Sequence, residues 1–458
     1  MSLKPCNAVN GVSLPKEAID SNFSDLHDPL SALQAKGEAD RCLYCYDAPC
    51  IQACPTSIDI PTFIHQIRTG NIEGSAKTIL SANIMGGTCA RACPTEVLCE
   101  QACVLNASEE QPVEIGALQR TAVDHLMAAH GPHPFKRAAE TGKRIAVVGA
   151  GPAGLSCAHR AAMLGHNVTI YEAKAKPGGL NEYGLAAYKM VDDFAQKEVA
   201  FLLGIGGIEI KYHQRLRCAQ GAPQGDAQED TVSLDELRDT FDVVYIGVGL
   251  GSTNALQLEG EDKDGILDAV DFIEDLRQAS EKSSIVVGDD VIVIGAGNTA
   301  IDAAVQAKRL GANTVTLVYR RGEENMSATD WEVNLARTNG VNIRLWSAPT
   351  AIKGNGRVEA MSFESMTVSD GKLIGSGKSF DLPADMVLKA IGQKLDASML
   401  DGFEMSGGKI TVGDNFETSI AGVFAGGDCI KSGDDLTVQA VEDGKQAAHA
   451  IDAYLAAK

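Results

Sequence analysis

The stretch RIAVVGAGPAGLSCAHRAAMLGHNVTIYEA, residues 144–173, decides the fold of this chain. It contains an apolar strand, a glycine turn, a helix of small residues and a second strand. The turn fills the G-x-G-x-x-G template, in which glycines allow the tight turn, the approach of a pyrophosphate and close helix–strand packing. The phosphates rest on the helix N-terminus. We therefore predict a doubly wound dinucleotide-binding domain, with contacts from Gly149, Gly151, Ala153 and Gly154.

The end of the second strand supports this interpretation over an ordinary glycine turn. Glu172 stands where a carboxylate accepts hydrogen bonds from an adenosine ribose. The apolar strand before the turn and the small-residue helix after it provide the context that a lone motif lacks.

A second copy of the unit, DVIVIGAGNTAIDAAVQAKRLGANTVTLVYRRG, covers residues 290–322. Its turn is the G-x-G-x-x-A variant. Two such units at domain-sized separation predict two α/β domains of the doubly wound kind. The expected contacts of the second turn are Gly295, Gly297, Asn298, Thr299 and Ala300.

The second unit lacks an acid at the end of its second strand and has Arg320 and Arg321 there. Two guanidinium groups suit a 2′-phosphate, through bidentate charge-assisted hydrogen bonds. The alternative is that both arginines lie on a solvated strand end. The missing acid favours NADPH over NADH.

Charge and hydropathy limit the partners and the location. The formal net charge of −21 argues against nucleic acid or an anionic membrane, which require clustered basic residues. The first ten residues lack the apolar run of a secretory signal. No stretch approaches the roughly 20 apolar residues that span a bilayer. These features predict a soluble cytoplasmic protein.

Eight of the 12 cysteines cluster in residues 42–103. They form two runs, C-x2-C-x4-C-x3-C-P from Cys42 and C-x3-C-P-x4-C-x3-C from Cys89. Clustering in a reducing compartment indicates metal or redox chemistry rather than disulfides. The other four, which we expect to be structural, are Cys6, Cys157, Cys218 and Cys429.

The pattern of these cysteines suits two kinds of metal centre, zinc or iron–sulfur clusters. Zinc binds thiolates from paired short spacings. Cys-Pro after a three-residue step is more typical of ferredoxin-like ligation, in which the last cysteine of a run can serve the other cluster. Redox-inert zinc would also leave electrons from a flavin without an exit, so the pattern favours iron–sulfur clusters.

The surrounding residues 1–135 predict a small all-α domain. Apolar residues recur three and four apart in 60–70, 72–83 and 115–130. Residues 131–143 are a Pro/Gly-punctuated linker, and 219–230 form a polar surface loop.

The segment GVFAGGD, residues 422–428, resembles the closing motif of two-dinucleotide flavoproteins of the glutathione- and thioredoxin-reductase type. That resemblance implies that the first site binds FAD and that the second unit is inserted into the FAD domain. The implied domains are 136–252 and 393–458 for FAD and 253–392 for NADPH. Further cofactor contacts expected in these domains are Gly179, Leu180, Lys189, Gly392, Gly427, Asp428 and Thr437.

CLYCYDAPCIQACPTSIDIPTFI (42–64), TCARACPTEVLCEQAC (88–103) and IGALQR (115–120), with both glycine units and VFAGGD, resemble the NADPH-oxidising half of dihydropyrimidine dehydrogenase. They look most like its bacterial electron-input subunit, a relative of the glutamate synthase small subunit. The resemblance implies two 4Fe-4S clusters with interleaved ligands, and Cys89 is left over. The implied ligands are Cys42, Cys45, Cys50 and Cys103 for the first cluster, and Cys54, Cys93, Cys99 and Gln119 for the second.

The resemblance has departures. Lys189 stands where the family has an arginine near the flavin, and the stretch after Arg321 lacks a further basic residue. Without the resemblance, Gln119 would be interpreted as a surface helix residue. The glutamate synthase small subunit usually has Glu at that position.

The resemblance implies hydride transfer from NADPH to FAD, then single electrons through the two clusters. A separate subunit with FMN and iron–sulfur centres would reduce uracil or thymine, because this chain lacks the FMN-bearing barrel. Alternatives are a glutamate synthase small subunit, an NADPH reductase serving another acceptor, and a zinc-stabilised binding module.

Overall fold

A computed structural model describes residues 14–108, 111–129, 131–217, 230–396, 399–431 and 435–458. Contacts divide the chain into two compact units. Of the described residues, the larger unit comprises those within 27–182, 192–251 and 395–458, and the inserted unit comprises those within 14–26, 183–191 and 252–394. Nearly all of the predicted loop 219–230 lies outside the described residues.

A parallel five-stranded sheet forms the centre of the larger unit, in the order β19-β6-β1-β2-β3. Because Val148 lies opposite both Tyr171 and Ile246, the carboxyl ends of three strands share one edge. The strand β19 comes from the far end of the chain and completes a sheet begun near residue 144. The strands are β1 (Arg144–Val148), β2 (Asn167–Tyr171), β3 (Ile208–Lys211), β6 (Val243–Ile246) and β19 (Val423–Ala425).

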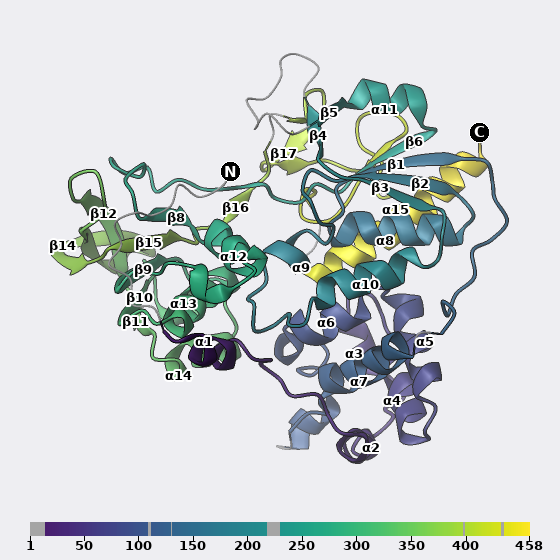
Figure 1. Ribbon diagram of the computed structural model, residues 1–458, viewed down its shortest axis with the longest axis horizontal. Coiled ribbons are helices and arrows are strands. Elements are labelled where there is room, and N and C mark those ends of the chain that lie inside the picture. The colour runs from purple at the N-terminus through teal and green to yellow at the C-terminus, as the bar shows by residue number, and fades with distance from the viewer. Residues whose placement is uncertain (1–13, 109–110, 130, 218–229, 397–398, 432–434) are drawn as a thin grey trace. The chain divides into compact units, whose positions relative to one another are not determined.

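Three helices, α8 (Pro152–Met163), α10 (Phe194–Leu203) and α15 (Thr437–Ala456), lie together on one face of this sheet (Figure 1). Small residues let α8 and α15 approach closely, since a Cβ at Gly444 would lie 2.1 Å from the carbonyl oxygen of Ala153. The other elements of the unit that follow β1 in the chain are short. They are α9 (Leu180–Tyr183), α11 (Leu234–Thr240), β4 (Gln214–Arg217), β5 (Asp230–Ser233), β17 (Met405–Ser406) and β18 (Lys409–Ile410).

The N-terminal part of the larger unit is helical, and the three predicted helices are confirmed as α4, α5 and α7. Side-chain caps begin α4 and α5: the side chain of Asp59 accepts from the N–H of Thr62, and that of Asn71 from the N–H of Gly74. The helices are α2 (Ala32–Asp40), α3 (Pro49–Gln52), α4 (Ile60–Arg68), α5 (Ile72–Ala82), α6 (Gly86–Ala92) and α7 (Ile115–Ala128), with 3-10 turns at Thr95–Val97 and Val104–Ser108.

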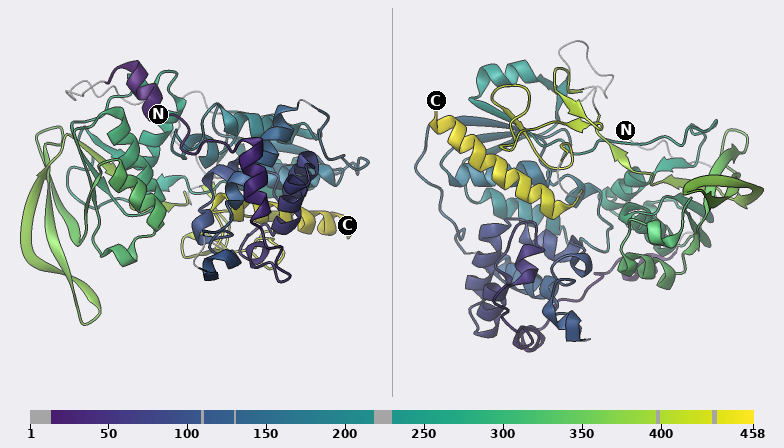
Figure 2. Two further views of the ribbon diagram at one scale, coloured as in Figure 1. Left: turned by 90° about the horizontal axis from the view of Figure 1, so that it is seen from below. Right: turned by 180° about the vertical axis from the view of Figure 1, so that it is seen from behind.

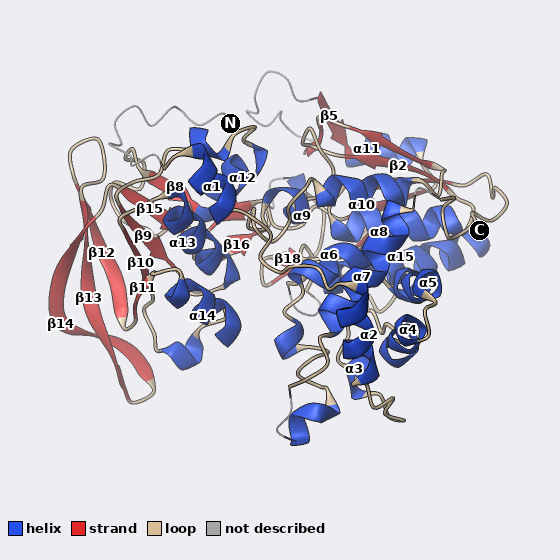
Figure 3. Cartoon of the chain, turned by 60° about the horizontal axis from the view of Figure 1, so that its bottom comes forward, coloured by secondary structure: helices blue, strands red, loops and turns tan. Residues whose placement is uncertain are grey.

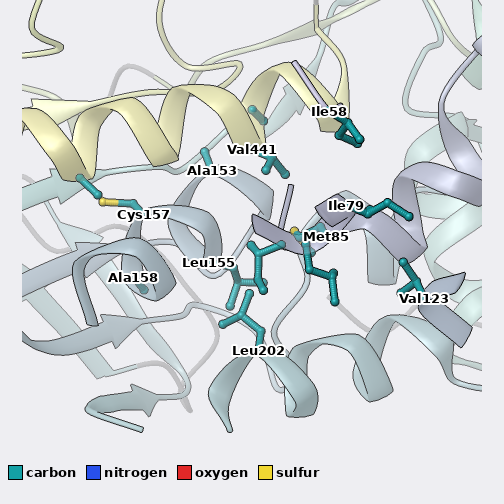
Figure 4. Close-up of a cluster of buried hydrophobic side chains, with 14 of the residues drawn as sticks. Ile58, Ile79, Met85, Val123, Ala153, Leu155, Cys157, Ala158, Leu202 and Val441 are labelled. Carbon is teal, nitrogen blue, oxygen red and sulfur yellow. The ribbon is translucent and has the colours of Figure 1, made fainter. Parts of the chain in front are cut away.

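The helical part shares its hydrophobic core with the sheet and its helices. Ile79, Met85 and Val123 belong to the same buried cluster as Leu155 of α8 and Val441 of α15 (Figure 4). This shared core joins the cysteine-bearing helices to the first glycine unit. Because close-packed interiors deform little, this core fixes the distance between the cysteine-bearing helices and the first glycine turn.

A second parallel sheet forms the centre of the inserted unit, in the order β11-β10-β9-β15-β8. An antiparallel sheet, β12-β13-β14, adjoins it (Figure 3), and the hairpin of β13 and β14 extends away from the parallel sheet (Figure 2). The strands are β7 (Ser252–Thr253), β8 (Ile266–Asp268), β9 (Asp290–Ile294), β10 (Thr314–Val318), β11 (Asn342–Arg344), β12 (Ser347–Lys353), β13 (Ala360–Ser369), β14 (Lys372–Pro383), β15 (Met386–Lys389) and β16 (Gln393–Lys394).

Two segments outside the predicted range 253–392 also pack in the inserted unit. The helix α1 (Lys16–Asn22) buries Ile19 in the same cluster as the buried residues of α13, whereas we had predicted it as part of the helical domain 1–135. Asn22 and Arg309 exchange hydrogen bonds of 2.8 and 2.9 Å. The other segment is 183–191. The helices are α12 (Ala269–Gln278), α13 (Asn298–Leu310) and α14 (Asp330–Thr338).

Among the described residues, no helix combines the length and the apolar character required to cross a membrane.

Candidate functional site

The first glycine turn has the backbone geometry that its motif predicts. Gly149 has a φ of +97°, and a Cβ at this residue would lie 2.5 Å from the carbonyl oxygen of Gly247. A Cβ at Gly154 would lie 1.9 Å from the carbonyl oxygen of Gly149. A side chain at Gly149 would collide with the backbone that follows β6, and one at Gly154 would push the helix away from the strand, which explains both glycines without reference to a ligand.

Glu172 follows β2 and reaches back to this turn. Its carboxylate accepts the N–H groups of Ala150 and Lys174, both at 2.8 Å. Burial raises the pKa of Glu172, and the two N–H donors oppose that rise by favouring the charged form. The carboxylate is thus held beside the glycine turn, where the sequence places the ribose contact.

The segment around Gly179 completes a cradle for an extended ligand. The N–H of Gly178 donates to the carbonyl oxygen of Ala150, and a Cβ at Gly179 would lie 2.7 Å from the Cα of Gly151. Backbone therefore lies against backbone across the turn. Leu180, which follows, keeps 38% of its surface exposed. This bare backbone suits a dinucleotide pyrophosphate.

Residues from the far end of the chain meet the same edge of the sheet. Gly427 donates its N–H to the buried carboxylate of Asp443 at 3.0 Å. Thr437, the first residue of α15, donates its hydroxyl to Asn181 at 2.9 Å. Burial and the nearby Asp435 raise the pKa of Asp428 to about 6. The structure thus brings the predicted FAD contacts Gly427, Asp428 and Thr437 into the unit that holds the first glycine turn.

In the inserted unit, the second glycine turn connects β9 to α13. Gly295 has a φ of +143°, and Ala300 is fully buried in the first turns of α13. Asn298 begins the helix, and its buried Oδ1 has no hydrogen-bond partner within the described residues. Such an orphaned acceptor fits a missing polar ligand. Thr299 and Gly297 flank it as the motif predicts.

Arg320 and Arg321 lie just beyond β10 and are both exposed. No ion pair or hydrogen bond of their guanidinium groups occurs among the residues that the structure describes. Both groups are therefore free to meet a phosphate. Gly392 lies in the connection from β15 to β16, where its carbonyl oxygen accepts the N–H of Asn254.

Lys189 belongs to segment 183–191, which packs with the inserted unit. Its ammonium forms ion pairs with Asp302 at 2.7 Å and with Glu332. Burial alone would lower the pKa of Lys189, but the two carboxylates outweigh burial and raise it. These ion pairs explain why a lysine is buried here, and its contact with a flavin remains a prediction.

The four cysteines assigned to the first cluster line one cavity. Its other walls are apolar and include Ile60, Ile64 and Ile115. All the described cysteines are free thiols. Among the described residues, no three Cys, His, Asp or Glu side chains converge as ligands of a single metal ion would. The cavity brings together Cys42, Cys45, Cys50 and Cys103.

Burial raises the pKa of Cys50 to about 11 and that of Cys99 well above its ordinary value. Bare thiolates would therefore be unstable here. Iron ions would supply the positive charge that stabilises them, so this donor set fits an iron–sulfur cluster.

The second set gathers around α6. The thiol of Cys93 lies close enough to Cys54 and Cys99 for charges on these groups to interact. Gln119 of α7 is buried, and its Nε2 donates to the carbonyl oxygen of Gly86 at 2.7 Å. This bond fixes the amide orientation and leaves Oε1 available as a ligand atom. Cys89, left over in the sequence pattern, is buried and lies one helical turn before Cys93, whose N–H donates to the carbonyl oxygen of Cys89 at 3.0 Å.

Sequence reasoning missed Glu198, a fully buried residue of α10. Its carboxylate accepts the N–H groups of Gly87 at 2.8 Å and Thr88 at 3.0 Å, and also the Thr88 hydroxyl. It therefore caps α6 from the sheet domain. Only its place on the buried face of an apolar helix could have marked it in the sequence.

Two family models match the chain. The family described as pyridine nucleotide-disulphide oxidoreductase matches residues 143–444. The domain described as dihydropyrimidine dehydrogenase domain II, 4Fe-4S cluster, matches residues 19–130. The second match covers the cysteine-bearing helices, and the first covers both glycine turns. The fold class predicted from the motifs is confirmed.

Curated relatives agree with these matches. The chain is 34% identical to the NAD-dependent dihydropyrimidine dehydrogenase subunit PreT of Escherichia coli K12, over 94% of this chain and 97% of that protein. It is 32% identical to the glutamate synthase [NADPH] small chain of the same strain, over 94% and 93%. Both relatives match almost end to end, so the resemblance inferred from the motifs is confirmed.

Solved structures agree on the fold. Mycobacterium tuberculosis FprA in complex with NADPH superposes with a TM-score of 0.56 at 19% identity, over 69% of this chain and 85% of that one. The matches confirm the predicted cofactor classes, which are FAD, a nicotinamide dinucleotide and 4Fe-4S clusters. The chain is an NAD(P)-dependent oxidoreductase that belongs to the pyridine nucleotide-disulphide oxidoreductase family and carries the 4Fe-4S domain of dihydropyrimidine dehydrogenase.

Proposed function

We propose that this chain is the electron-input subunit of a dihydropyrimidine dehydrogenase. It would oxidise NADPH and deliver the electrons to a partner chain with FMN and iron–sulfur centres, which reduces uracil or thymine. NADPH gives up two electrons as a hydride, and the pyrimidine takes up two electrons and two protons, one of them from solvent. Bound FAD would accept the hydride, and two 4Fe-4S clusters would carry single electrons.

The observation that carries this proposal is the shared core of the larger unit. It joins the cavity lined by Cys42, Cys45, Cys50 and Cys103 to the sheet that holds the first glycine turn. A rigid connection suits electron transfer, because its rate falls steeply with distance. A zinc-binding module would need no such connection.

Contacts of α15 suggest the order of the two clusters. Lys445 of this helix donates to the carbonyl oxygens of Ala82 and Thr56, at 2.8 and 3.5 Å. Thr56 closely follows Cys54, which is assigned to the second cluster. We therefore assign the second cluster to the side of the helical part that lies nearest α15. The first cluster is then assigned to the outer side, where Leu43 and Val104 border its cavity and are 59% and 41% exposed. We infer that electrons leave for the partner from this outer side.

Arg320 and Arg321 support NADPH as the coenzyme. The relative PreT is named NAD-dependent and the glutamate synthase relative is named for NADPH, so similarity alone leaves the coenzyme open. Two exposed guanidinium groups at the end of β10 favour a ligand with a 2′-phosphate.

The test is anaerobic co-expression of this chain with a pyrimidine-reducing partner chain that carries FMN, followed by an assay of NADPH oxidation that depends on uracil. We expect oxidation only when both chains and uracil are present. A Cys50→Ser variant should still reduce its flavin with NADPH but should lose the uracil-dependent rate.

A glutamate synthase small subunit is the second candidate, favoured by 32% identity over nearly the whole of both chains. A co-purifying partner with a glutaminase domain, or oxidation that depends on glutamine and 2-oxoglutarate, would establish it. Wild-type protein without acid-labile sulfide would overturn both candidates.

A further inference from the structure

Two buried side chains that are not cluster ligands lie beside thiols assigned to the second cluster. The hydroxyl Oγ1 of Thr56 lies 3.3 Å from Sγ of Cys54. Cys89 lies one helical turn before Cys93. Thr56 and Cys89 are each only 2% exposed, so water does not compete for these contacts.

Local backbone structure places both donors. After Cys54 the chain turns sharply: the N–H of Ser57 donates to the carbonyl oxygen of Cys54 at 2.8 Å, and Ser57 has a φ of +53°. This turn brings the Thr56 hydroxyl back to the sulfur. Cys89 and Cys93 lie one helical turn apart at α6, where the N–H of Cys93 donates to the carbonyl oxygen of Cys89 at 3.0 Å. Residues four apart share one helix face.

The charge state of a ligated thiol determines which atom donates. A cysteine bound to iron is a thiolate, which can only accept hydrogen bonds. Thr56 would then donate O–H to Cys54, and Cys89 would donate S–H to Cys93. With Cys54, Cys93, Cys99 and Gln119 assigned to the four ligand positions, Cys89 is a thiol outside the ligand set.

We propose that Thr56 and Cys89 are positioning residues that raise the reduction potential of the second cluster by donating hydrogen bonds to its Cys54 and Cys93 thiolates. Such bonds withdraw electron density from the sulfurs and stabilise the reduced cluster, which carries the greater negative charge. A higher potential would favour electron uptake from the flavin side. The inference rests on the proposed function, since it requires the second cluster.

Four single variants separate the donor role from packing. Thr56→Val removes the hydroxyl at nearly constant volume, and Cys89→Ala removes the thiol. Thr56→Ser and Cys89→Ser keep a donor at each position. Thr78→Val is the matched control, because its hydroxyl donates to the carbonyl oxygen of Gly74 in the same helical region and touches no thiol that is assigned to a cluster.

The measurement is an anaerobic redox titration of the purified chain followed by electron paramagnetic resonance, with iron and flavin content determined for each variant. We expect Thr56→Val and Cys89→Ala each to shift the midpoint potential of one cluster to more negative values. The shifts should add in the double variant. Both serine variants should recover part of the shift, and Thr78→Val should leave both clusters unchanged.

Three outcomes would overturn the inference. Unchanged potentials in both donor-removing variants would assign Thr56 and Cys89 to packing alone. Loss of about half of the iron in Cys89→Ala would make Cys89 a ligand. If the variants fail to fold, the wild-type protein supplies the test. Electron–nuclear double resonance that detects no cluster-coupled proton exchanging in deuterated water would overturn the inference. An absence of iron and labile sulfide in wild-type protein would instead remove the proposed function.

Discussion

Glu198 gives the sharpest prediction about stability, because it is a carboxyl group with no exposed surface. Burial raises its pKa to about 7 from 4.5, and its hydrogen bonds with the Thr88 side chain and with the N–H groups of Thr88 and Gly87 only partly oppose this. Arg91 lies near enough to oppose it as well. Between pH 4.5 and about pH 7, the folded protein therefore holds a proton on Glu198 that the unfolded chain would release.

The sign of the pH dependence follows from this raised value. A group whose folded pKa is raised stabilises the fold fully below its unfolded pKa, and this stabilisation disappears as pH rises through the folded pKa. A shift from 4.5 to about 7 corresponds to about 3 kcal/mol, of which roughly 2–3 kcal/mol should be lost between pH 5 and pH 8. Replacing Glu198 with glutamine removes the titration and keeps one oxygen as an acceptor for α6.

The assay is anaerobic urea unfolding of the cofactor-loaded chain, followed by circular dichroism from pH 5 to pH 8. The stability difference between wild type and Glu198→Gln should change by roughly 2–3 kcal/mol across this range, with wild type losing more stability as pH rises. Glu73→Gln, at an exposed position on α5, is the control and should show no such change. Parallel pH profiles for wild type and Glu198→Gln would refute the reasoning.

Three further predictions follow from the same structure. Changing Arg320 and Arg321 to serine should raise KM for NADPH by about 10–100-fold, the equivalent of losing charge-assisted hydrogen bonds, and should alter KM for NADH less than about 3-fold; equal changes in initial-rate assays would remove the 2′-phosphate assignment. Burial, His133 and Arg160 lower the pKa of His159 to about 3, so stability should fall as pH drops from about 6.5 towards 3, and thermal melts of His159→Phe should lack this acid loss. Lys189→Ala strands two buried carboxylates and should cost about 3–5 kcal/mol in urea unfolding while FAD stays bound; loss of FAD from a folded variant would support a flavin contact instead.

Predictions from short-range patterns agreed well with the structure. The glycine turns at Gly149 and Gly295 follow from the spacing of residues without side chains, because a Cβ there would collide with backbone. The helices α4, α5 and α7 follow from apolar periodicity, and α4 and α5 also from the caps Asp59 and Asn71. These signals act within a few residues, so a single sequence carries them completely.

The sequence by itself therefore determined the glycine turns, the helices around the cysteines, the cysteine spacing and the family. Tertiary structure alone decided which side chains meet across long separations in the chain. Glu198 caps α6, Lys189 joins Asp302, and α1 packs in the inserted unit because burial and hydrogen bonding select these partners, and no local pattern records them.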